Sequence, residues 1–334
     1  METPAPRPVV FCSWHFPDDG LALLREVADV HVWEGNDGAP REALLAELPQ
    51  AAAVFALPPT DRLDEAAMDI APHLKVICGF GVGYDYVDVA AATRRGILVC
   101  NTPGTLTETT ADQAWALLLA AARNVAQGDR FVRSGAWKKY EPALLLGADV
   151  HGATLGIIGL GAIGTAVARR AAGFGMRLLY SGRSRKADVE AATGAEFRSL
   201  DELLQEADFV SINCALTAET RGLIGARELA LMKPTAILVN TARGAIVDQA
   251  ALARALKEGR IAAAGIDVYE QEPLPPGDPL LECETAVLVP HLGSATHATR
   301  ARMARVAAEN IVAGLQGRRP PNLVNPEAWR EPTA

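Results

Sequence analysis

Short apolar runs rich in β-branched residues alternate with longer segments of helical periodicity along nearly the whole chain. The runs are continuous rather than alternately polar, which is typical of strands that are buried on both faces of a parallel sheet. Parallel strands joined by helices form βαβ units, so the pattern predicts an α/β protein. The first five predicted strands are residues 8–12, 30–33, 52–57, 74–79 and 97–100.

A second series of strands follows a long apolar helix that we predict over residues 109–134. A final helix, over residues 295–315, has no strand after it, which favours one domain inserted into another. We predict an outer domain of residues 1–102 and 291–334 and an inserted domain of residues 103–290, with hinges near Thr102 and Pro290. The second series has the six strands of a dinucleotide-binding domain, at residues 154–158, 176–180, 209–213, 236–240, 262–266 and 287–289.

The composition narrows the classes of partner. The chain has 334 residues, enough for two domains, and a net charge of −8, which gives no positive field for nucleic acid or anionic lipid. The longest apolar run, residues 114–122, is shorter than the roughly 20 residues of a membrane-spanning helix. Residues 1–8 lack the basic and apolar stretches of an export signal, so we expect a cytoplasmic protein. Five scattered cysteines show neither metal-site nor disulfide spacing, so we expect reduced thiols and no metal.

A glycine-rich turn marks the start of the inserted domain. Gly159, Gly161 and Gly164 form a G-x-G-x-x-G motif that directly follows a predicted strand and opens a helical run. Glycines permit a tight turn and close approach of the backbone to a pyrophosphate, which the helix N-terminus then faces. A glycine-rich turn without a ligand is the weaker alternative. We therefore expect two doubly wound parallel-sheet domains, with a Rossmann cofactor domain inserted into a flavodoxin-like substrate domain.

The second strand of the inserted domain ends in a basic loop. NAD-binding domains normally carry an acid there, which binds the ribose 2′-hydroxyl. This chain has no acid before Asp188, whereas Arg183, Ser184 and Arg185 could bind a 2′-phosphate. The loop favours NADP(H) over NAD(H), although NAD(H) stays possible and a solvated basic loop is the alternative.

Three groups suited to the reduction of a 2-oxo acid follow neighbouring strands. Arg243 could bind the carboxylate, His291 could donate a proton, and Glu272 could keep the imidazole protonated. Each alone has an ordinary structural explanation, but the carboxyl ends of parallel strands lie at one edge of a sheet. His297 is the rival for proton donor, and we favour His291 because it directly follows a strand.

A second glycine-rich segment, residues 80–85, follows a strand of the outer domain. Its glycines would leave the main-chain N–H groups of Val82 and Gly83 open to an anion. We expect these groups to hold the substrate carboxylate from the outer domain.

The chain resembles the D-isomer-specific 2-hydroxyacid dehydrogenases, in particular their glyoxylate and hydroxypyruvate reductase branch. The similarity runs through residues 80–85, 109–112, 131–135, 159–164, 240–244, 265–268 and 290–297. It implies the catalytic trio Arg243, Glu272 and His291, with Val82, Gly83 and Ser294 at the substrate. It also implies cofactor contacts from Thr110, Gly159, Leu160, Gly161, Ala162, Ile163, Gly164, Arg183, Ser184, Arg185, Lys186, Ala215, Thr241, Ala242, Asp267 and Gly293.

The resemblance also bears on partners and substrate. Members are usually homodimers joined through their cofactor domains. Phosphite dehydrogenases of this superfamily carry a lysine where Val82 stands and an acid where Gly182 stands, so phosphite is disfavoured. Animal glyoxylate reductases place a tryptophan from the partner near the position of Leu144, which leaves the preferred acid open.

Two alternatives remain from the sequence. Some relatives are non-catalytic co-repressors that sense the cofactor, but such a protein needs no proton donor like His291. A dehydrogenase for a larger 2-hydroxy acid, such as phosphoglycerate, often has an added regulatory domain, and this chain ends soon after its last predicted helix.

Overall fold

The computed structural model describes residues 6–35, 37–58 and 61–331. The chain divides into two compact units, Met1–Leu106 with Thr296–Ala334, and Thr107–Ala295. The divisions follow residues 106 and 295 instead of the predicted 102 and 290. The second differs because the N–H groups of Leu292 and Gly293 bond Asp267, deep in the second unit. Residues 1–5, which carry most of the segment used to exclude an export signal, lie outside the described residues.

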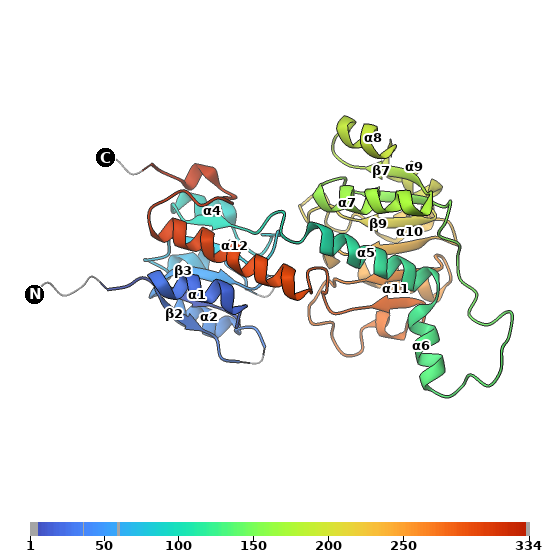
Figure 1. Cartoon of the computed structure of the whole chain (residues 1–334), viewed down its shortest axis with the longest axis horizontal. Coiled ribbons are helices and arrows are strands. Elements are labelled where there is room, and N and C mark those ends of the chain that lie inside the picture. The colour runs from blue at the N-terminus through green and yellow to red at the C-terminus, as the bar shows by residue number, and fades with distance from the viewer. Residues whose placement is uncertain (1–5, 36, 59–60, 332–334) are drawn as a thin grey trace, which may run out of the picture. The chain divides into compact units, whose positions relative to one another are not determined.

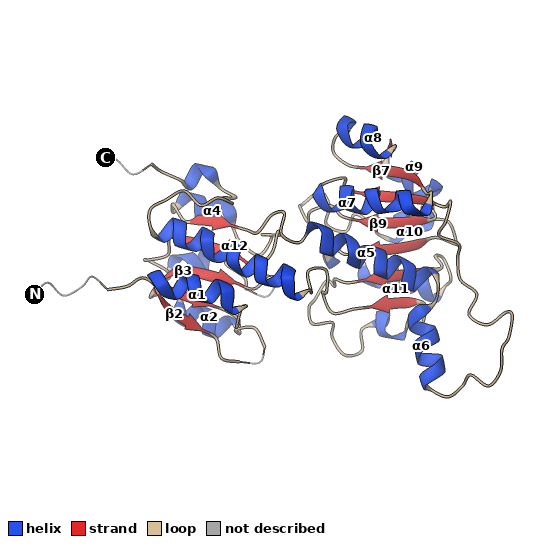
Figure 2. Ribbon diagram, viewed as in Figure 1, coloured by secondary structure: helices blue, strands red, loops and turns tan. Residues whose placement is uncertain are grey.

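The first unit contains a five-stranded parallel sheet in the order β2-β1-β3-β4-β5. This is the strand order of flavodoxin-like folds, as the sequence predicted. All six residues of β3 are buried, because helices cover both faces of the sheet (Figure 2). The strands are β1 (Val9–Cys12), β2 (Asp29–Val32), β3 (Ala51–Ala56), β4 (Val76–Gly79) and β5 (Leu98–Cys100).

The C-terminal helix α12 (His297–Leu315) packs beside α1 (Asp18–Val27), although the two are far apart in sequence (Figure 1). The side chain of Thr296 caps α12 by accepting the Thr299 N–H at 3.2 Å. Both ends of the chain therefore build one unit, with the other unit inserted between them. The remaining helices of this unit are α2 (Arg41–Glu47), α3 (Glu65–Asp69), α4 (Val89–Arg94) and the 3-10 turn η4 (Pro326–Ala328).

The second unit contains a seven-stranded parallel sheet in the order β12-β11-β10-β9-β6-β7-β8. The six strands β8-β7-β6-β9-β10-β11 have the Rossmann order 3-2-1-4-5-6 when β6 is counted as the first strand. The seventh strand, β12, is added at the edge beside β11. The sequence predicted six of these strands and missed the two-residue β8, which is too short to form an apolar run. The strands are β6 (Thr154–Ile158), β7 (Arg177–Ser181), β8 (Glu196–Phe197), β9 (Phe209–Ile212), β10 (Ile237–Asn240), β11 (Ala263–Ile266) and β12 (Ala286–Leu288).

The single long helix predicted over residues 109–134 is wrong: the structure has α5 (Thr107–Ala122) and α6 (Val125–Arg133). Asn124 breaks the helix with a φ of 50°, a left-handed conformation that asparagine tolerates. The other helices are α7 (Ala162–Ala171), α8 (Ala187–Thr193), α9 (Leu200–Glu206), α10 (Ala226–Leu231), α11 (Gln249–Lys257) and the 3-10 turns η1 (Ala172–Phe174), η2 (Gly244–Ile246) and η3 (Pro279–Glu282).

Two features bear on the expectations from composition. All five cysteines have free thiols, and four of them are buried. No helix among residues 6–35, 37–58 and 61–331 combines the length and apolarity needed to cross a bilayer.

Candidate active site

The glycine-rich turn joins β6 to α7 at the carboxyl edge of the second sheet. Gly159 has a φ of 93°, and a Cβ there would lie 2.6 Å from the Cys214 nitrogen, so only glycine fits. A Cβ on Gly161 would meet no described atom within 4 Å, which leaves its backbone open to a ligand. The helix α7 begins directly afterwards, at Ala162, so its first N–H groups face this turn.

Two buried polar atoms at the same edge fit a bound dinucleotide. Within the described part of the chain, Thr241 Oγ1 and Asn213 Oδ1 are buried and have no hydrogen-bond partner. Asn213 follows β9, which pairs with β6, and Thr241 follows β10, the next strand along the sheet. A buried polar atom is costly unless a ligand or water satisfies it, so these atoms suit contacts with a nicotinamide dinucleotide.

The predicted cofactor residues gather at this edge. Thr110, from α5, approaches Gly293: a Cβ on Gly293 would lie 3.4 Å from Thr110 Cγ2. The rest follow the strands β6, β7, β9, β10, β11 and β12 in turn, at Gly159–Gly164, Arg183–Lys186, Ala215, Thr241–Ala242, Asp267 and Gly293.

The basic loop after β7 is tied to the next helix. The Arg185 guanidinium donates to both carboxylate oxygens of Glu190, at 3.1 and 2.6 Å, and the Tyr180 hydroxyl also donates to Glu190. These two donors, Arg185 first, lower the pKa of Glu190 to about 2. Arg185 is therefore partly neutralised in this structure, which the sequence did not indicate.

The second strand-end cluster pairs an imidazole with an acid. His291 Nδ1 lies 2.7 Å from Glu272 Oε2, while Glu272 Oε1 accepts the Tyr269 N–H at 3.0 Å. The Glu272 side chain is 16% exposed and that of His291 is 39% exposed. With Nδ1 held by the acid, the other ring nitrogen, Nε2, is the one available to a substrate.

Burial alone would raise the pKa of Glu272, but the net pKa is lowered. The hydrogen bond and charge of His291 outweigh burial, helped by the Tyr269 N–H and the positive charge of Arg243. All three members of the predicted trio thus interact electrostatically within one unit. The rival His297 lies in the other unit, as the first residue of α12.

Close packing of two loops brings Arg243 to this cluster. A Cβ on Gly244 would lie 1.8 Å from the Tyr269 carbonyl carbon, so only glycine allows the loop after β10 to touch the loop after β11. Asn240 holds the first loop by donating to the Arg243 carbonyl at 2.9 Å and accepting the Ala242 N–H at 3.0 Å. The Arg243 side chain is thereby set beside the loop that carries Glu272.

Asp267 has a positioning role that sequence reasoning missed. Its fully buried carboxylate accepts the Leu292 N–H at 2.5 Å and the Gly293 N–H at 2.8 Å, and its carbonyl accepts the His291 N–H at 2.9 Å. These bonds hold His291 at a φ of 53°, a conformation that is uncommon for a residue other than glycine. Burial raises the pKa of Asp267, although the Leu292 N–H and the charge of His291 oppose this. The sequence signal for this role is an acid, Asp267, at the end of one strand and a glycine, Gly293, shortly after the next strand.

The remaining predicted substrate residues divide between the units. Ser294 follows His291 in the second unit, whereas Val82 and Gly83 follow β4 in the first unit. The site of the second unit can therefore be described as a glycine turn with open main-chain groups, an acid–imidazole pair and an arginine.

A Rossmann domain with these groups at its strand ends defines a nicotinamide-dependent oxidoreductase. Comparison with known proteins agrees. Residues 115–293 match the family described as D-isomer specific 2-hydroxyacid dehydrogenase, NAD binding domain. The chain is 51% identical over 322 residues to a glyoxylate reductase of Korarchaeum cryptofilum, covering 96% of this chain and 97% of that protein.

Solved structures agree as well. A crystal structure of a Thermus thermophilus protein superposes with a TM-score of 0.88 at 48% identity, covering 95% of this chain and 99% of the other. An NADPH-dependent glyoxylate/hydroxypyruvate reductase of Sinorhizobium meliloti, solved with NADP and malonate, has a TM-score of 0.86 at 32% identity, with 98% and 99% covered. The chain belongs to the D-isomer specific 2-hydroxyacid dehydrogenase family. The predicted fold class, family and enzyme class are confirmed.

Proposed function

We propose that the protein reduces a small 2-oxo acid, glyoxylate or hydroxypyruvate, to the 2-hydroxy acid with NADPH. The observation that carries this proposal is the His291–Glu272 pair at 2.7 Å, set beside the charge of Arg243. The names of the Korarchaeum cryptofilum and Sinorhizobium meliloti relatives support the substrate class.

In this mechanism Arg243 binds the substrate carboxylate with its planar guanidinium. The N–H groups of Val82 and Gly83 are likewise suited to bind a carboxylate. A nicotinamide held beside Thr241 and Gly293 would supply the hydride that the carbonyl carbon accepts. His291 gives the proton on Nε2 to the carbonyl oxygen, which becomes the hydroxyl. Glu272 holds Nδ1 and stabilises the imidazolium before transfer, while Ser294 lines the pocket.

The turn Gly159–Gly164 would hold the pyrophosphate of the cofactor, and Thr241, Ala242, Asp267, Gly293, Ala215 and Thr110 would line the rest of its site. Arg183, Ser184 and Lys186 would bind the 2′-phosphate, with Arg185 shared between that phosphate and Glu190. The absence of an acid in residues 182–187 supports NADPH over NADH.

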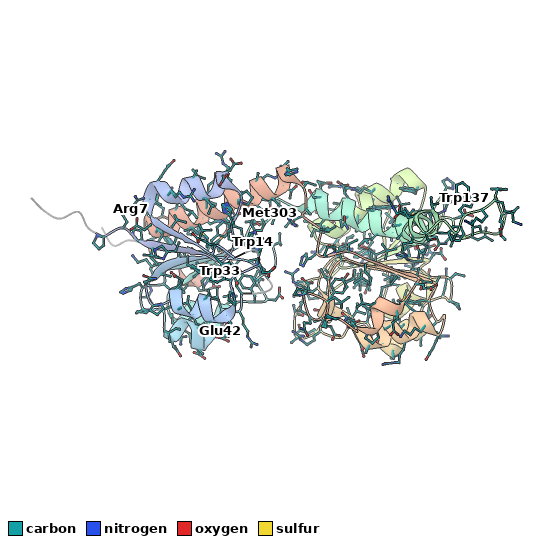
Figure 3. All side chains as sticks on the ribbon, turned by 90° about the horizontal axis from the view of Figure 1, so that it is seen from below. Arg7, Trp14, Trp33, Glu42, Trp137 and Met303 are labelled. Carbon is teal, nitrogen blue, oxygen red and sulfur yellow. The ribbon has the colours of Figure 1, made fainter. Side chains whose placement is uncertain are left out.

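We also propose a homodimer formed through the second unit. Apart from Leu281, the exposed large apolar side chains described in this unit gather on α6 and on residues 134–149 after it, at Val125, Val132, Trp137, Tyr140, Leu145 and Leu146. Trp137 lies on this segment, which extends beyond the sheet of its own unit (Figure 3). Light scattering should give twice the mass of the chain, and Trp137→Ser with Tyr140→Ser should shift it toward the monomer.

Steady-state reduction of glyoxylate, hydroxypyruvate, pyruvate and phenylpyruvate with each cofactor tests the activity. We expect the first two acids to give the highest kcat/KM, and NADPH to exceed NADH. Turnover of none of the four acids would contradict reduction and favour a non-catalytic sensor. A higher kcat/KM with NADH would contradict only the cofactor preference, and a preference for larger acids only the substrate.

A further inference from the structure

The loop that carries Val82 and Gly83 is supported by the chain that leaves β5. The Thr102 N–H donates to the Gly81 carbonyl at 2.9 Å, beyond the last paired residues of β4 and β5. Beyond Gly81 a side chain takes over the pairing: Asn101 Nδ2 donates to the Val82 carbonyl at 2.8 Å.

This side-chain bond sets the direction of a main-chain donor. The Val82 carbonyl and the Gly83 N–H belong to one planar trans peptide unit, so they point in opposite directions. An amide that holds the carbonyl on one side therefore aims the N–H to the other side. Within residues 6–35, 37–58 and 61–331, the N–H groups of Val82 and Gly83 donate no hydrogen bond to protein.

Asn101 is itself held by the C-terminal part of the chain. Its carbonyl accepts a bond from Asn310 Nδ2 at 3.1 Å, and its N–H donates to the Asn322 carbonyl at 3.3 Å. Asn310 lies on α12, is fully buried, and accepts the Asn322 N–H at 2.9 Å. The main chain of Asn101 is thus fixed by bonds to Asn310 and Asn322, and this places its side-chain amide for the bond to the Val82 carbonyl.

We propose that Asn101 is a positioning residue for the substrate: it orients the Val82–Gly83 peptide so that the Gly83 N–H binds the carboxylate. The inference rests on the proposed function, because that function places the carboxylate at this loop. Asn101 needs no contact with the substrate, and it carries no charge that would compete for the anion.

The test measures substrate affinity separately from turnover. In Asn101→Ala the peptide unit loses its support, and we expect KM for glyoxylate to rise about 10-fold, as for loss of one bond to a charged group. The Kd of oxalate, titrated into the NADP(H)-bound protein, should rise by a similar factor. The KM for NADPH and kcat should change less than about 2-fold, because neither depends on this peptide. Asn101→Asp keeps the size and removes the donor, and serves if the alanine variant fails to fold.

Asn325 provides a matched control from the same region. It is 2% exposed, and it ties the C-terminal segment to the start of β5 by accepting the Val99 N–H at 2.8 Å and donating to the Ile97 carbonyl at 2.9 Å. Asn325→Ala should lower Tm and leave the KM for glyoxylate and the Kd of oxalate as in the unaltered protein.

The outcomes separate the two proposals. Oxalate binding that weakens in Asn101→Ala, without turnover by the unaltered protein, would support the positioning role and contradict the proposed activity. Turnover with an unchanged glyoxylate KM in both Asn101 variants would overturn the positioning role alone. An equal loss of oxalate affinity in Asn101→Ala and Asn325→Ala would also overturn the positioning role. So would the absence of oxalate binding by the unaltered protein.

Discussion

The two units present different chemistry at the carboxyl ends of their parallel strands. The second unit offers titratable side chains, with Glu272 and His291 paired at 2.7 Å under the charge of Arg243. The first unit offers main-chain N–H groups, those of Val82 and Gly83, beside the neutral amide of Asn101. Moving a proton requires groups that change charge, whereas orienting an anion requires only fixed dipoles. In the proposed function, the second unit therefore supplies the groups that move the proton, and the first unit supplies fixed dipoles suited to an anion.

Buried carboxyl groups show the same contrast. Asp61, in the first unit, is 1% exposed, and burial raises its pKa to about 6 although the Ser13 hydroxyl and the Leu57 N–H donate to it. Glu272 has its pKa lowered despite burial, because His291 and Arg243 supply positive charge. A cation beside the carboxyl group thus outweighs burial in the second unit, and neutral donors do not in the first.

The strongest test of the contrast removes the proposed proton donor. His291→Ala should lower kcat by about 10² to 10⁴-fold, the usual contribution of a general acid, with cofactor binding retained. His297→Ala is the matched control, because that imidazole lies in the other unit. Near-normal kcat in His291→Ala, or an equal loss in His297→Ala, would break the assignment of the reaction to the second unit.

A smaller effect is expected when the acid partner loses its charge. Glu272→Gln should lower kcat about 10- to 100-fold, as for loss of a hydrogen bond to a charged group. Because its pKa is lowered on folding, Glu272 stabilises the protein fully above about pH 4.5, and this is lost as pH falls through the lowered pKa. Melting curves between pH 7 and pH 3 should therefore show a steeper acid decline for the unaltered protein than for Glu272→Gln. Parallel declines would contradict the ion pair.

Asp61 should show the opposite sign. Its folded pKa of about 6 lies above the ordinary 3.8, so the folded state binds the extra proton between these values and stability falls as pH rises through them. From pH 7 to pH 4 the unaltered protein should gain about 2 to 3 kcal/mol of unfolding free energy relative to Asp61→Asn. Urea unfolding of both proteins at the two pH values measures this, and a gain of equal size in Asp61→Asn would contradict it.

The smallest effect concerns the basic loop. Glu190→Gln releases Arg185 from its ion pair, and the kcat/KM ratio of NADPH to NADH should rise about 2- to 5-fold, the scale of an exposed salt bridge. Arg183→Ala should lower the same ratio. A ratio that falls in Glu190→Gln would mean that Glu190 presents Arg185 to the cofactor instead of withholding it.

Much of this protein follows from local pattern. Continuous apolar runs predicted eleven of the twelve strands found among the described residues, because strands covered on both faces need no polar positions. The candidate site could be predicted because its residues come shortly after predicted strands. This holds for the glycine motif at Gly159 and for Arg243, Glu272 and His291.

What only the tertiary structure decided are pairings between residues far apart in the chain. No periodicity links Asn101 to Asn310, or Asp267 to the N–H of Gly293. The first pair forms only when α12 packs in the first unit, and the second only when the segments after β11 and β12 meet in the second. The ion pair of Arg185 with Glu190 was missed because it needs the loop to fold back onto α8. Hydrophobic patterning determines which segments become strands and helices, whereas hydrogen-bond geometry across the finished sheet determines where their donors and acceptors point.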